Sequence, residues 1–539
     1  MKRKKMIGLL LVGSLLLVGC SSKKPEDKTS GKKEDKQTIS VASASELSTG
    51  DVSLAMDNTA VQAVSQFGEG LYAFDGNGKA VPALAKEVVE PTNKGLTYEF
   101  ELREANWSNG KKITAQDFEY SWKRTVDKKT ASPQAYYFSG IKNYQKIADG
   151  ELEADKLGIK AVDDTTIEVT LEYPMSYFLE LLAVPAFYPL NQEYVEEKGA
   201  KFGTDSENIL YNGPYTMVGW SGTNNEWSYE KNKEYWDKEQ VNFDKINVTV
   251  IKEGSTAQNM FDSGQLDEVS ISGDLVAQYK DSPNLAIRSV PGTYYIELNT
   301  KNGLFDNVKA RQAVALSLDS KTLAEDVLRD GSLESPGFVP KGFISNTTKK
   351  DFAEEVGQIA KSDKKQGQSL WTEAKKELGK DKLTISILCS DTDNAKKISE
   401  YVQGALNDNL DGLTVDVKAV PFNNRLEMSR KGEFDIVLGG WTPVFADPVD
   451  FLNLLTAKNS NNFGQWDHPK FNQLIDQVNG EFANDYDKRW ELMMEADKIV
   501  SEEAPLVPLF QISESYLISD KISNFKPGPL GPVYYKDLK

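Results

Sequence analysis

The sequence has very few of the residues that bind soft metals or cross-link small folds. Its 539 residues contain one histidine, His468, and two cysteines, Cys20 and Cys389. Zinc, haem and copper centres need several imidazole or thiolate ligands, so we expect no metal and no cofactor of this kind. A disulfide framework is excluded as well, because a separate role is predicted below for Cys20.

Two signatures of catalysis are also missing. The chain has no Gly-x-Ser-x-Gly nucleophile elbow and no Gly-x-x-x-x-Gly-Lys-Ser/Thr phosphate loop. A nucleophilic system would have to use His468, which stands directly before Pro469 in a polar stretch typical of a loop or helix entry. We therefore expect no enzyme. A hydrolase with a carboxylate pair is kept as a remote alternative, because 81 acidic residues always offer such pairs.

Positive charge is in short supply. The sequence has 63 Lys and Arg against 81 Asp and Glu, a net charge of −18, which argues against a nucleic-acid partner held by its phosphates. Nothing after Cys20 is long and apolar enough to span a bilayer. The length itself favours about three to four structural units at roughly 150 residues each.

The amino terminus has the pattern of a targeting segment. Four cations in Met1–Lys5 precede an apolar run over Met6–Gly19, which ends in Leu-Val-Gly before Cys20. This layout resembles a bacterial lipoprotein signal with its lipobox. The resemblance implies cleavage of residues 1–19 and acylation of Cys20, by diacylglycerol and a further chain such as palmitate. An ordinary secretory signal with an incidental cysteine is the alternative.

The expected consequence is a protein anchored to the outer face of the cell membrane. Two or more acyl chains give stable anchoring, whereas one chain is marginal. Residues 20–37 contain the lipidated cysteine and then a stretch dominated by Lys, Glu, Asp and Ser, which cannot bury enough apolar surface to become ordered. We interpret this stretch as a flexible tether.

From Thr38 onward, strand-like and helix-like patterns alternate, which is typical of an α/β protein. Apolar residues recur at every second position in four predicted strands: Tyr98, Phe100 and Leu102; Ile167, Val169 and Leu171; Ile246, Val248 and Val250; Leu383, Ile385 and Ile387. Cys389 continues the last alternation, so we expect a buried thiol. Thr114 and Asp117 predict a capped helix start, and a second helix is predicted over about residues 307–318.

The most specific motif covers Leu102–Gly110, which reads Leu-Arg-Glu-Ala-Asn-Trp-Ser-Asn-Gly, with Ile113–Phe118 after it. It resembles the signature stretch of the oligopeptide-binding family of extracellular solute-binding proteins, which serve ABC importers. Further matching segments follow in the order of the family: Glu69–Tyr72, Pro82–Ala85, Ser132–Pro133 with Tyr136 and Tyr137, Asn212–Tyr215, Leu298–Thr300, Arg311–Ala313, and Gly440–Trp441 with Asp447–Pro448.

The resemblance implies a two-lobed, periplasmic-binding-protein-like α/β fold of the large peptide-binding type. Lobe I would combine residues 38–81, 208–306 and 505–539, with residues 82–207 as an extra subdomain, and lobe II would cover residues 307–504. The implied protein captures oligopeptides outside the cell as a monomer and delivers them to the permease subunits of an ABC transporter. A dedicated receptor for a hydrophobic signalling peptide, using the same type of importer, is the alternative.

The resemblance also implies a peptide-binding set. It consists of Tyr136, Tyr137, Asn299, Gly440, Trp441, Thr442, Val444 and Asp447. Asn299 and the backbone of residues 440–442 would bond the peptide main chain, and the tyrosines would supply stacking area. For Tyr136, Tyr137 and Trp441, core packing is the alternative. Trp107 and Trp122 are assigned to the core, and Arg311 to a structural role.

Val444 marks a departure from the family. Its members usually read Trp-x-x-Asp-Tyr-x-Asp-Pro here, and the first aspartate commonly pairs with the free amine of the peptide. This chain has Val444 in that place, while Asp447 matches the second acid, which need not point into the cleft. Valine cannot neutralise an ammonium group. The amine is then held by another acid, projects into water, or is absent from a blocked or apolar ligand. We favour the second or third reading.

Overall fold

The computed structural model describes residues 37–344, 350–357 and 362–539. Residues 37–539 form one compact unit. The predicted signal peptide, Cys20 and all of the tether except Gln37 lie outside the described residues, so these predictions are not tested. Among the described helices, none is long and apolar enough to cross a membrane.

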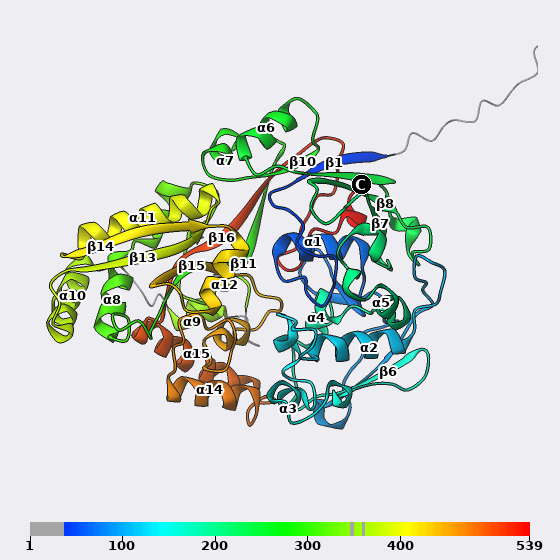
Figure 1. Cartoon of the computed structure of the whole chain (residues 1–539), viewed down its shortest axis with the longest axis horizontal. Helices are drawn as coiled ribbons and strands as arrows, with labels where there is room; N and C mark the ends of the chain where they lie inside the picture. The colour runs from blue at the N-terminus through cyan, green and yellow to red at the C-terminus, as the bar shows by residue number, and fades with distance from the viewer. Residues whose placement is uncertain (1–36, 345–349, 358–361) are drawn as a thin grey trace, which may run out of the picture. The chain divides into compact units, whose positions relative to one another are not determined.

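One large sheet of eleven strands organises this unit (Figure 1). Its strand order is β14-β13-β15-β11-β16-β10-β1-β9-β8-β7, and β12 pairs beside β16. The strands are β1 (Thr38–Ser43), β7 (Tyr215–Val218), β8 (Glu226–Lys231), β9 (Lys245–Val250), β10 (Glu268–Ile271), β11 (Leu285–Leu298), β12 (Leu333–Glu334), β13 (Leu383–Ser390), β14 (Leu413–Val420), β15 (Ile436–Trp441) and β16 (Leu506–Ile518).

Two long antiparallel strands connect the two ends of this sheet. β11 and β16 pair from Leu285 opposite Leu517 to Glu297 opposite Leu506, with a register shift between Ser289 and Thr293. On one side β16 pairs with β10, and on the other β11 pairs with β15. The strands of both predicted lobes therefore belong to one sheet. The boundaries predicted between the lobes and the subdomain stay a prediction.

Two small sheets lie within residues 72–170. The first pairs β2 (Tyr72–Phe74) with β3 (Ala80–Pro82), and the second has the order β4 (Thr97–Glu101), β6 (Thr166–Thr170) and β5 (Ile159–Ala161). All four predicted period-two strands are confirmed, because their alternate residues lie in β4, β6, β9 and β13 or directly beyond the strand ends. Cys389 is fully buried in β13, as expected.

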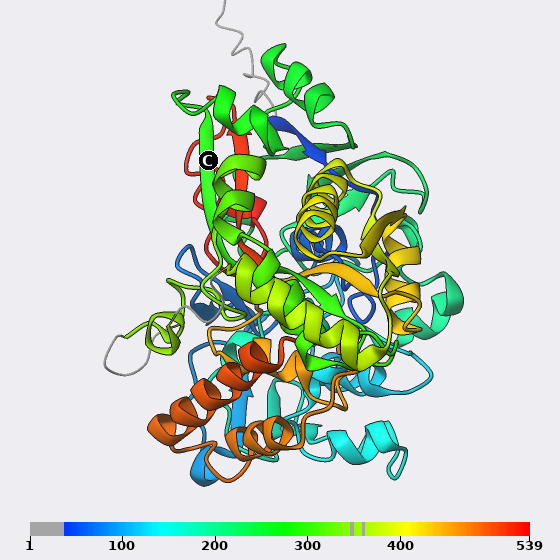
Figure 2. The same cartoon turned by 90° about the vertical axis from the view of Figure 1, so that its left-hand side faces the viewer.

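The helices surround these sheets (Figures 1 and 2). They are α1 (Asn58–Phe67), α2 (Ala115–Val126), α3 (Tyr144–Asp149), α4 (Phe178–Leu181), α5 (Gln192–Lys198), α6 (Gly254–Asp262), α7 (Asp274–Gln278), α8 (Val308–Ser317), α9 (Phe352–Val356), α10 (Lys364–Leu378), α11 (Asp393–Asn409), α12 (Phe422–Arg430), α13 (Val449–Leu452), α14 (Pro469–Asn479) and α15 (Tyr486–Glu503). The predicted capping box is confirmed at α2, where Thr114 and Asp117 bond each other's backbone. The second predicted helix is α8, which Asn307 caps.

Buried apolar side chains gather in three main clusters. One joins β1, α1, β7–β9 and the carboxyl-terminal segment, and a second packs α8, α10 and α11 on β13 and β15. The third is continuous from residues 71–187 to residues 338–506, and it contains Trp107 and Trp122, which confirms their assignment to the core. Arg311 is structural as predicted, since it bonds Glu503 and the carbonyl of Phe305.

Candidate functional site

β15 presents half of its length as a sheet edge. It pairs with β11 over all six residues, from Ile436 opposite Leu298 to Trp441 opposite Thr293. Its pairing with β13 covers only Ile436 and Val437. Among the described residues, the stretch from Gly439 to Trp441 therefore pairs with a strand on one side only. Its other side can accept a further strand.

A glycine lets this edge lie close to its neighbour. Gly440 is exposed, and a Cβ atom at this position would lie 2.7 Å from Cδ2 of Tyr294. The Tyr294 ring is held in turn by stacking on Phe510, with ring centroids 5.1 Å apart. A side chain at position 440 would therefore push against a supported aromatic ring, which explains why glycine is needed here.

Asp450, in the first turn of α13, fixes the turn that follows this edge. Its Oδ2 accepts hydrogen bonds from Nε1 of Trp441 at 3.1 Å and from the backbone N–H of Val444 at 3.0 Å. The side chain is buried, and burial raises the pKa of Asp450 to about 7, with a further upward contribution from the charge of Asp447. Trp441 and Val444 are half-buried beside it, whereas Thr442 is exposed.

Asp447 has a different environment, because it has a cation partner. Arg489, in α15, donates to its carboxylate from both terminal guanidinium nitrogens, Nη1 and Nη2. The distance from Nη2 to Oδ1 is 3.1 Å. Both side chains are buried, and Asp447 also accepts a bond from the N–H of Val449. The structure thus directs Asp447 toward Arg489. Its predicted contact with a ligand stays a prediction.

Tyr136 and Tyr137 lie together in the short 3-10 helix Ala135–Phe138. Their ring centroids are 4.3 Å apart, and both side chains are half-buried. The Tyr136 hydroxyl is buried, and among the described residues it has no hydrogen-bond partner within 3.5 Å. Burial raises the pKa of both tyrosines, and the negative charge of Asp450 contributes in the same direction. The pair is therefore electrostatically coupled to the acid behind Trp441.

A stacked pair joins residues from two distant parts of the sequence at this site. The rings of Tyr177, directly before α4, and Phe445 lie with centroids 3.9 Å apart and nearly parallel planes. The guanidinium of Arg489 stands 5.8 Å from the Tyr177 ring. Residues from the predicted subdomain and from predicted lobe II therefore contact each other beside Asp447 and Asp450.

Asn299 is not brought to this group. It follows the end of β11 where Leu298 pairs with Ile436, at the opposite end of β15 from Trp441. Its amide nitrogen donates to the carbonyls of Gly432 and Phe434 at 3.0 and 2.9 Å, and its oxygen accepts from the N–H of Lys301. It lines a separate open cavity of about 440 Å³. Its predicted peptide contact stays a prediction.

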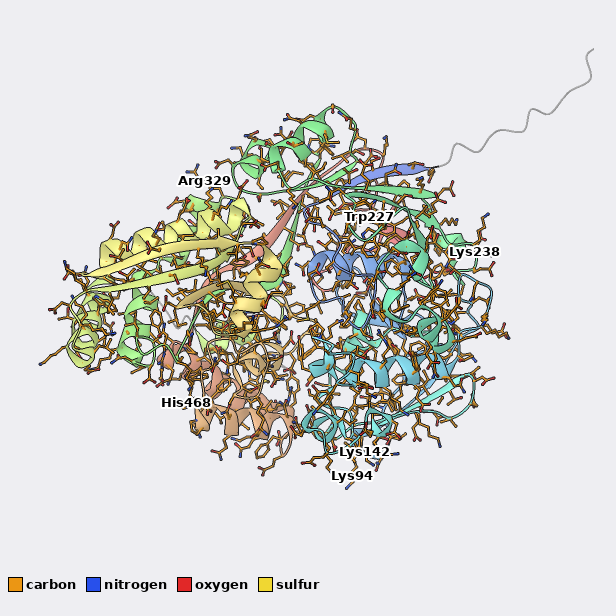
Figure 3. All side chains as sticks on the ribbon, in the orientation of Figure 1. Lys94, Lys142, Trp227, Lys238, Arg329 and His468 are labelled. Carbon is orange, nitrogen blue, oxygen red and sulfur yellow. The ribbon has the colours of Figure 1, made fainter. Side chains whose placement is uncertain are left out.

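His468 lies at the start of α14 (Figure 3), where its Nδ1 accepts the N–H of Phe471 at 3.2 Å. This confirms the expected helix entry. Within the described ranges, no three His, Cys, Asp or Glu side chains are grouped to hold a metal ion.

Sequence reasoning missed three residues of this site, namely Asp450, Tyr177 and Arg489. Asp450 carries one weak signal, since it is a second acid three residues after Asp447 and next to an apolar stretch. Nothing local indicates that its carboxylate turns back to Trp441. The stacking of Tyr177 on Phe445 depends on a long-range contact that has no local pattern.

Comparison with known proteins gives concordant matches. Residues 79–463 match the model of the bacterial extracellular solute-binding proteins, family 5. The chain is 35% identical to the dipeptide-binding protein of Lactococcus lactis subsp. cremoris, over 86% of each chain. The structure of Listeria monocytogenes OppA bound to peptide superposes with a TM-score of 0.88 and 36% identity, covering 94% of this chain and 99% of that one.

The structure of the pheromone receptor PrgZ also has a TM-score of 0.88, at 34% identity, over 94% of this chain and 99% of the other. Such matches confirm the predicted α/β, two-lobed fold class. They cover nearly all of the chain from the tether onward, and the family model alone spans well over half of it. The chain therefore belongs to the bacterial extracellular solute-binding proteins of family 5.

Proposed function

We propose that this protein binds oligopeptides outside the cell and delivers them to the permease of an ABC importer. The relatives named as dipeptide-binding protein and as OppA bound to peptide support this proposal. The observation that carries it is the strand edge at Gly439–Trp441, which lacks a partner strand on one side among the described residues.

An extended peptide is the natural partner for such an edge. Adding a strand satisfies the free N–H and C=O groups of the edge with groups that every peptide has, whatever its side chains. The exposed positions 440 and 442 leave room for the peptide backbone, and the half-buried Trp441 and Val444 supply apolar contact area. Affinity taken from the main chain suits a protein that accepts many sequences.

The proposed activity is binding without bond cleavage. The two acids at the site, Asp447 and Asp450, are both buried and engaged by Arg489, Trp441 and the backbone of Val444. The relatives are named as binding proteins or receptors. We further propose that the protein works as a monomer anchored on the outer face of the cell membrane through lipid on Cys20.

The ligand can be identified directly. Native mass spectrometry of the purified protein should reveal a peptide mass that disappears on denaturation, and a randomised peptide library should then give several unrelated ligands. Finding no peptide mass and no binder in the library, while another small solute saturates the protein, would refute the proposal. Incubation with labelled peptides and glycans should give no cleavage products.

The lipid anchor has its own test. Cells given labelled palmitate should label the wild-type protein, and Cys20→Ala should abolish labelling and release the protein into the medium. Equal labelling of Cys20→Ala and wild type would refute the anchor without affecting the peptide-binding proposal. Ser21→Ala is the matched control, since it leaves the acylated residue in place.

A receptor for one hydrophobic signalling peptide is the second candidate function. It is favoured by the similarity to the pheromone receptor PrgZ and by the apolar Val444 at the site. The same library separates the two candidates. Many ligands of comparable affinity support capture for nutrition, whereas one tight hydrophobic ligand supports signalling.

A further inference from the structure

Asp447 and Asp450 are neighbouring buried acids at the site, and they differ in whether a cation forms an ion pair with them. Asp447 has Arg489, whereas no described cation forms an ion pair with Asp450. A buried carboxylate without a cation is unfavourable in its charged form. Asp450 is therefore a place where a positively charged group from outside the chain would be stabilised.

Asp450 contacts Val444, the residue at which this chain departs from the family pattern. The sequence resemblance predicts an acid at position 444, whereas this chain has Val444, whose backbone N–H donates directly to Asp450. Both hydrogen bonds made to Asp450 by described residues end on Oδ2. The other oxygen, Oδ1, can accept from a ligand without loss of the bonds that hold the turn.

Aromatic rings near this carboxylate add a second source of attraction for a cation. Burial raises the pKa of Tyr136, Tyr137 and Tyr177, and the negative charge of Asp450 contributes in the same direction. Tyrosine faces attract ammonium groups, most strongly where water is excluded. The buried Tyr136 hydroxyl, which has no hydrogen-bond partner within 3.5 Å among the described residues, is a further acceptor.

We propose that Asp450, with the Tyr136 and Tyr137 pair, receives the α-ammonium group of the bound peptide and so replaces the acid that Val444 has displaced. The inference rests on the proposed peptide-binding function. Of the three explanations given for Val444, it selects the one in which another acid holds the amine. The sequence alone favours the other two, an amine that projects into water or a blocked or apolar ligand. The ligands are then peptides with a free amino terminus near Trp441, and a blocked amine costs affinity.

The test compares matched peptides with free and acetylated amino termini on wild type and on Asp450→Asn. Asparagine keeps an oxygen that can accept from Trp441 and Val444, so the turn is preserved while the charge is lost. We expect wild type to bind the free peptide at least tenfold more tightly, and Asp450→Asn to bind both forms within about twofold. Calorimetry measures the four dissociation constants.

Asp497→Asn is the matched control. Asp497, in α15, is likewise buried without a partner for its Oδ1, and burial raises its pKa to about 7. Its replacement should leave the preference for the free amine unchanged. A preference that persists in Asp450→Asn, or is absent from wild type, overturns the inference. If no peptide binds wild type at all, the proposed function itself fails, which is a different result.

A third peptide distinguishes binding of the α-ammonium group from binding of a lysine side-chain ammonium group. An acetylated peptide with a lysine side chain at its first position offers the same chemistry from a side chain. We expect it to bind wild type as weakly as the acetylated peptide without lysine. If it binds as tightly as the free peptide and responds equally to Asp450→Asn, the site is a lysine pocket and the assignment to the α-amine is wrong.

A pH series on wild type keeps the proposal testable if Asp450→Asn does not fold. The charged and titratable groups facing Asp450 are Asp447 with its partner Arg489, and Tyr136, Tyr137 and Tyr177. Burial raises the pKa of the three tyrosines, and the charge of Asp447 raises that of Arg489, so these four side chains keep their charge states between pH 7 and pH 5. The α-amine of a peptide, with a pKa of about 8, also stays protonated in this window. The free-amine preference should therefore fall as pH drops below about 7, where Asp450 becomes protonated. A ratio that stays constant contradicts the proposal.

Discussion

The rings of Tyr177 and Phe445 stack with their centroids 3.9 Å apart, and they join two segments that are separated by about half of the chain's length. Tyr177 is the N-cap residue of α4, whereas Phe445 lies in the turn between β15 and α13. The turn that carries Val444 and contacts Asp450 is therefore also the turn that contacts the predicted subdomain.

Phe445→Leu should accelerate peptide dissociation about fivefold. Leucine retains most of the apolar volume but loses the aromatic stacking, which is worth about 1 kcal/mol in such pairs. Stopped-flow measurement of the dissociation rate tests this. Phe178→Leu is the control, because Phe178 contacts Tyr98 inside one segment, and it should lower thermal stability without a faster dissociation rate.

Gly440→Ala should weaken peptide binding and destabilise the protein by about 1–3 kcal/mol, the usual cost of forcing extra atoms into a packed region. The added Cβ would lie 2.7 Å from the Tyr294 ring, which is braced by Phe510. Denaturant unfolding and calorimetry measure the two effects.

Gly404→Ala provides the opposite control. Gly404 lies within α11 and has open space around its Cβ position, so alanine should stabilise the protein by about 0.5–1 kcal/mol with no change in affinity. If both substitutions behave alike, the packing argument for Gly440 is wrong.

Arg489→Met should destabilise the protein by about 3–5 kcal/mol, because it leaves the buried Asp447 carboxylate without its cation. Lys431→Met removes an exposed partner of Glu427 at 2.6 Å and should leave stability nearly unchanged. Urea unfolding of both variants measures the difference. Equal effects would show that the Asp447–Arg489 pair does not stabilise the fold.

Glu268→Gln should alter the pH dependence of stability. Oε2 of Glu268 is buried in β10 and has no hydrogen-bond partner in the described part of the chain, and burial raises the pKa of Glu268 to about 8 from an ordinary value near 4.5. The folded state therefore binds more protons than the unfolded state between these values, so wild-type stability falls as pH rises through this window.

Glutamine does not titrate, so the variant should match wild type near pH 5 and exceed it at pH 9. The upper limit of this gain is about 4 kcal/mol for a pKa shift of this size. Thermal unfolding at both pH values measures it. A gain that is the same at pH 5 and pH 9 would contradict a charge-dependent cost at Glu268.

Local patterns in the sequence predicted those parts of the fold that depend on neighbouring residues. The alternation at Ile385 and Ile387 identified β13, and Thr114 with Asp117 located the start of α2, because strand pleating and helix capping act over a few positions. The pairing of β11 with both β15 and β16 was not predictable from pattern, since it joins residues more than 100 positions apart.

Contacts between residues far apart in the sequence also limited the prediction of the site. The resemblance assigned both Asn299 and the backbone of residues 440–442 to the peptide, but the structure places Asn299 and Trp441 at opposite ends of β15, and both assignments stay predictions. Asp450 could not be found from the sequence. Its importance comes from burial and from its contacts with Trp441 and Val444, which exist only after the chain folds.

The most direct test of the central claim is calorimetry with peptides of unrelated sequence, each prepared also with a single N-methylated amide near its amino terminus. If β15 binds the peptide main chain, several sequences should bind with dissociation constants within about tenfold of one another. N-methylation should then weaken each by about tenfold or more, since it removes a backbone donor. Binding that is indifferent to N-methylation, or absent for every peptide, would contradict the account.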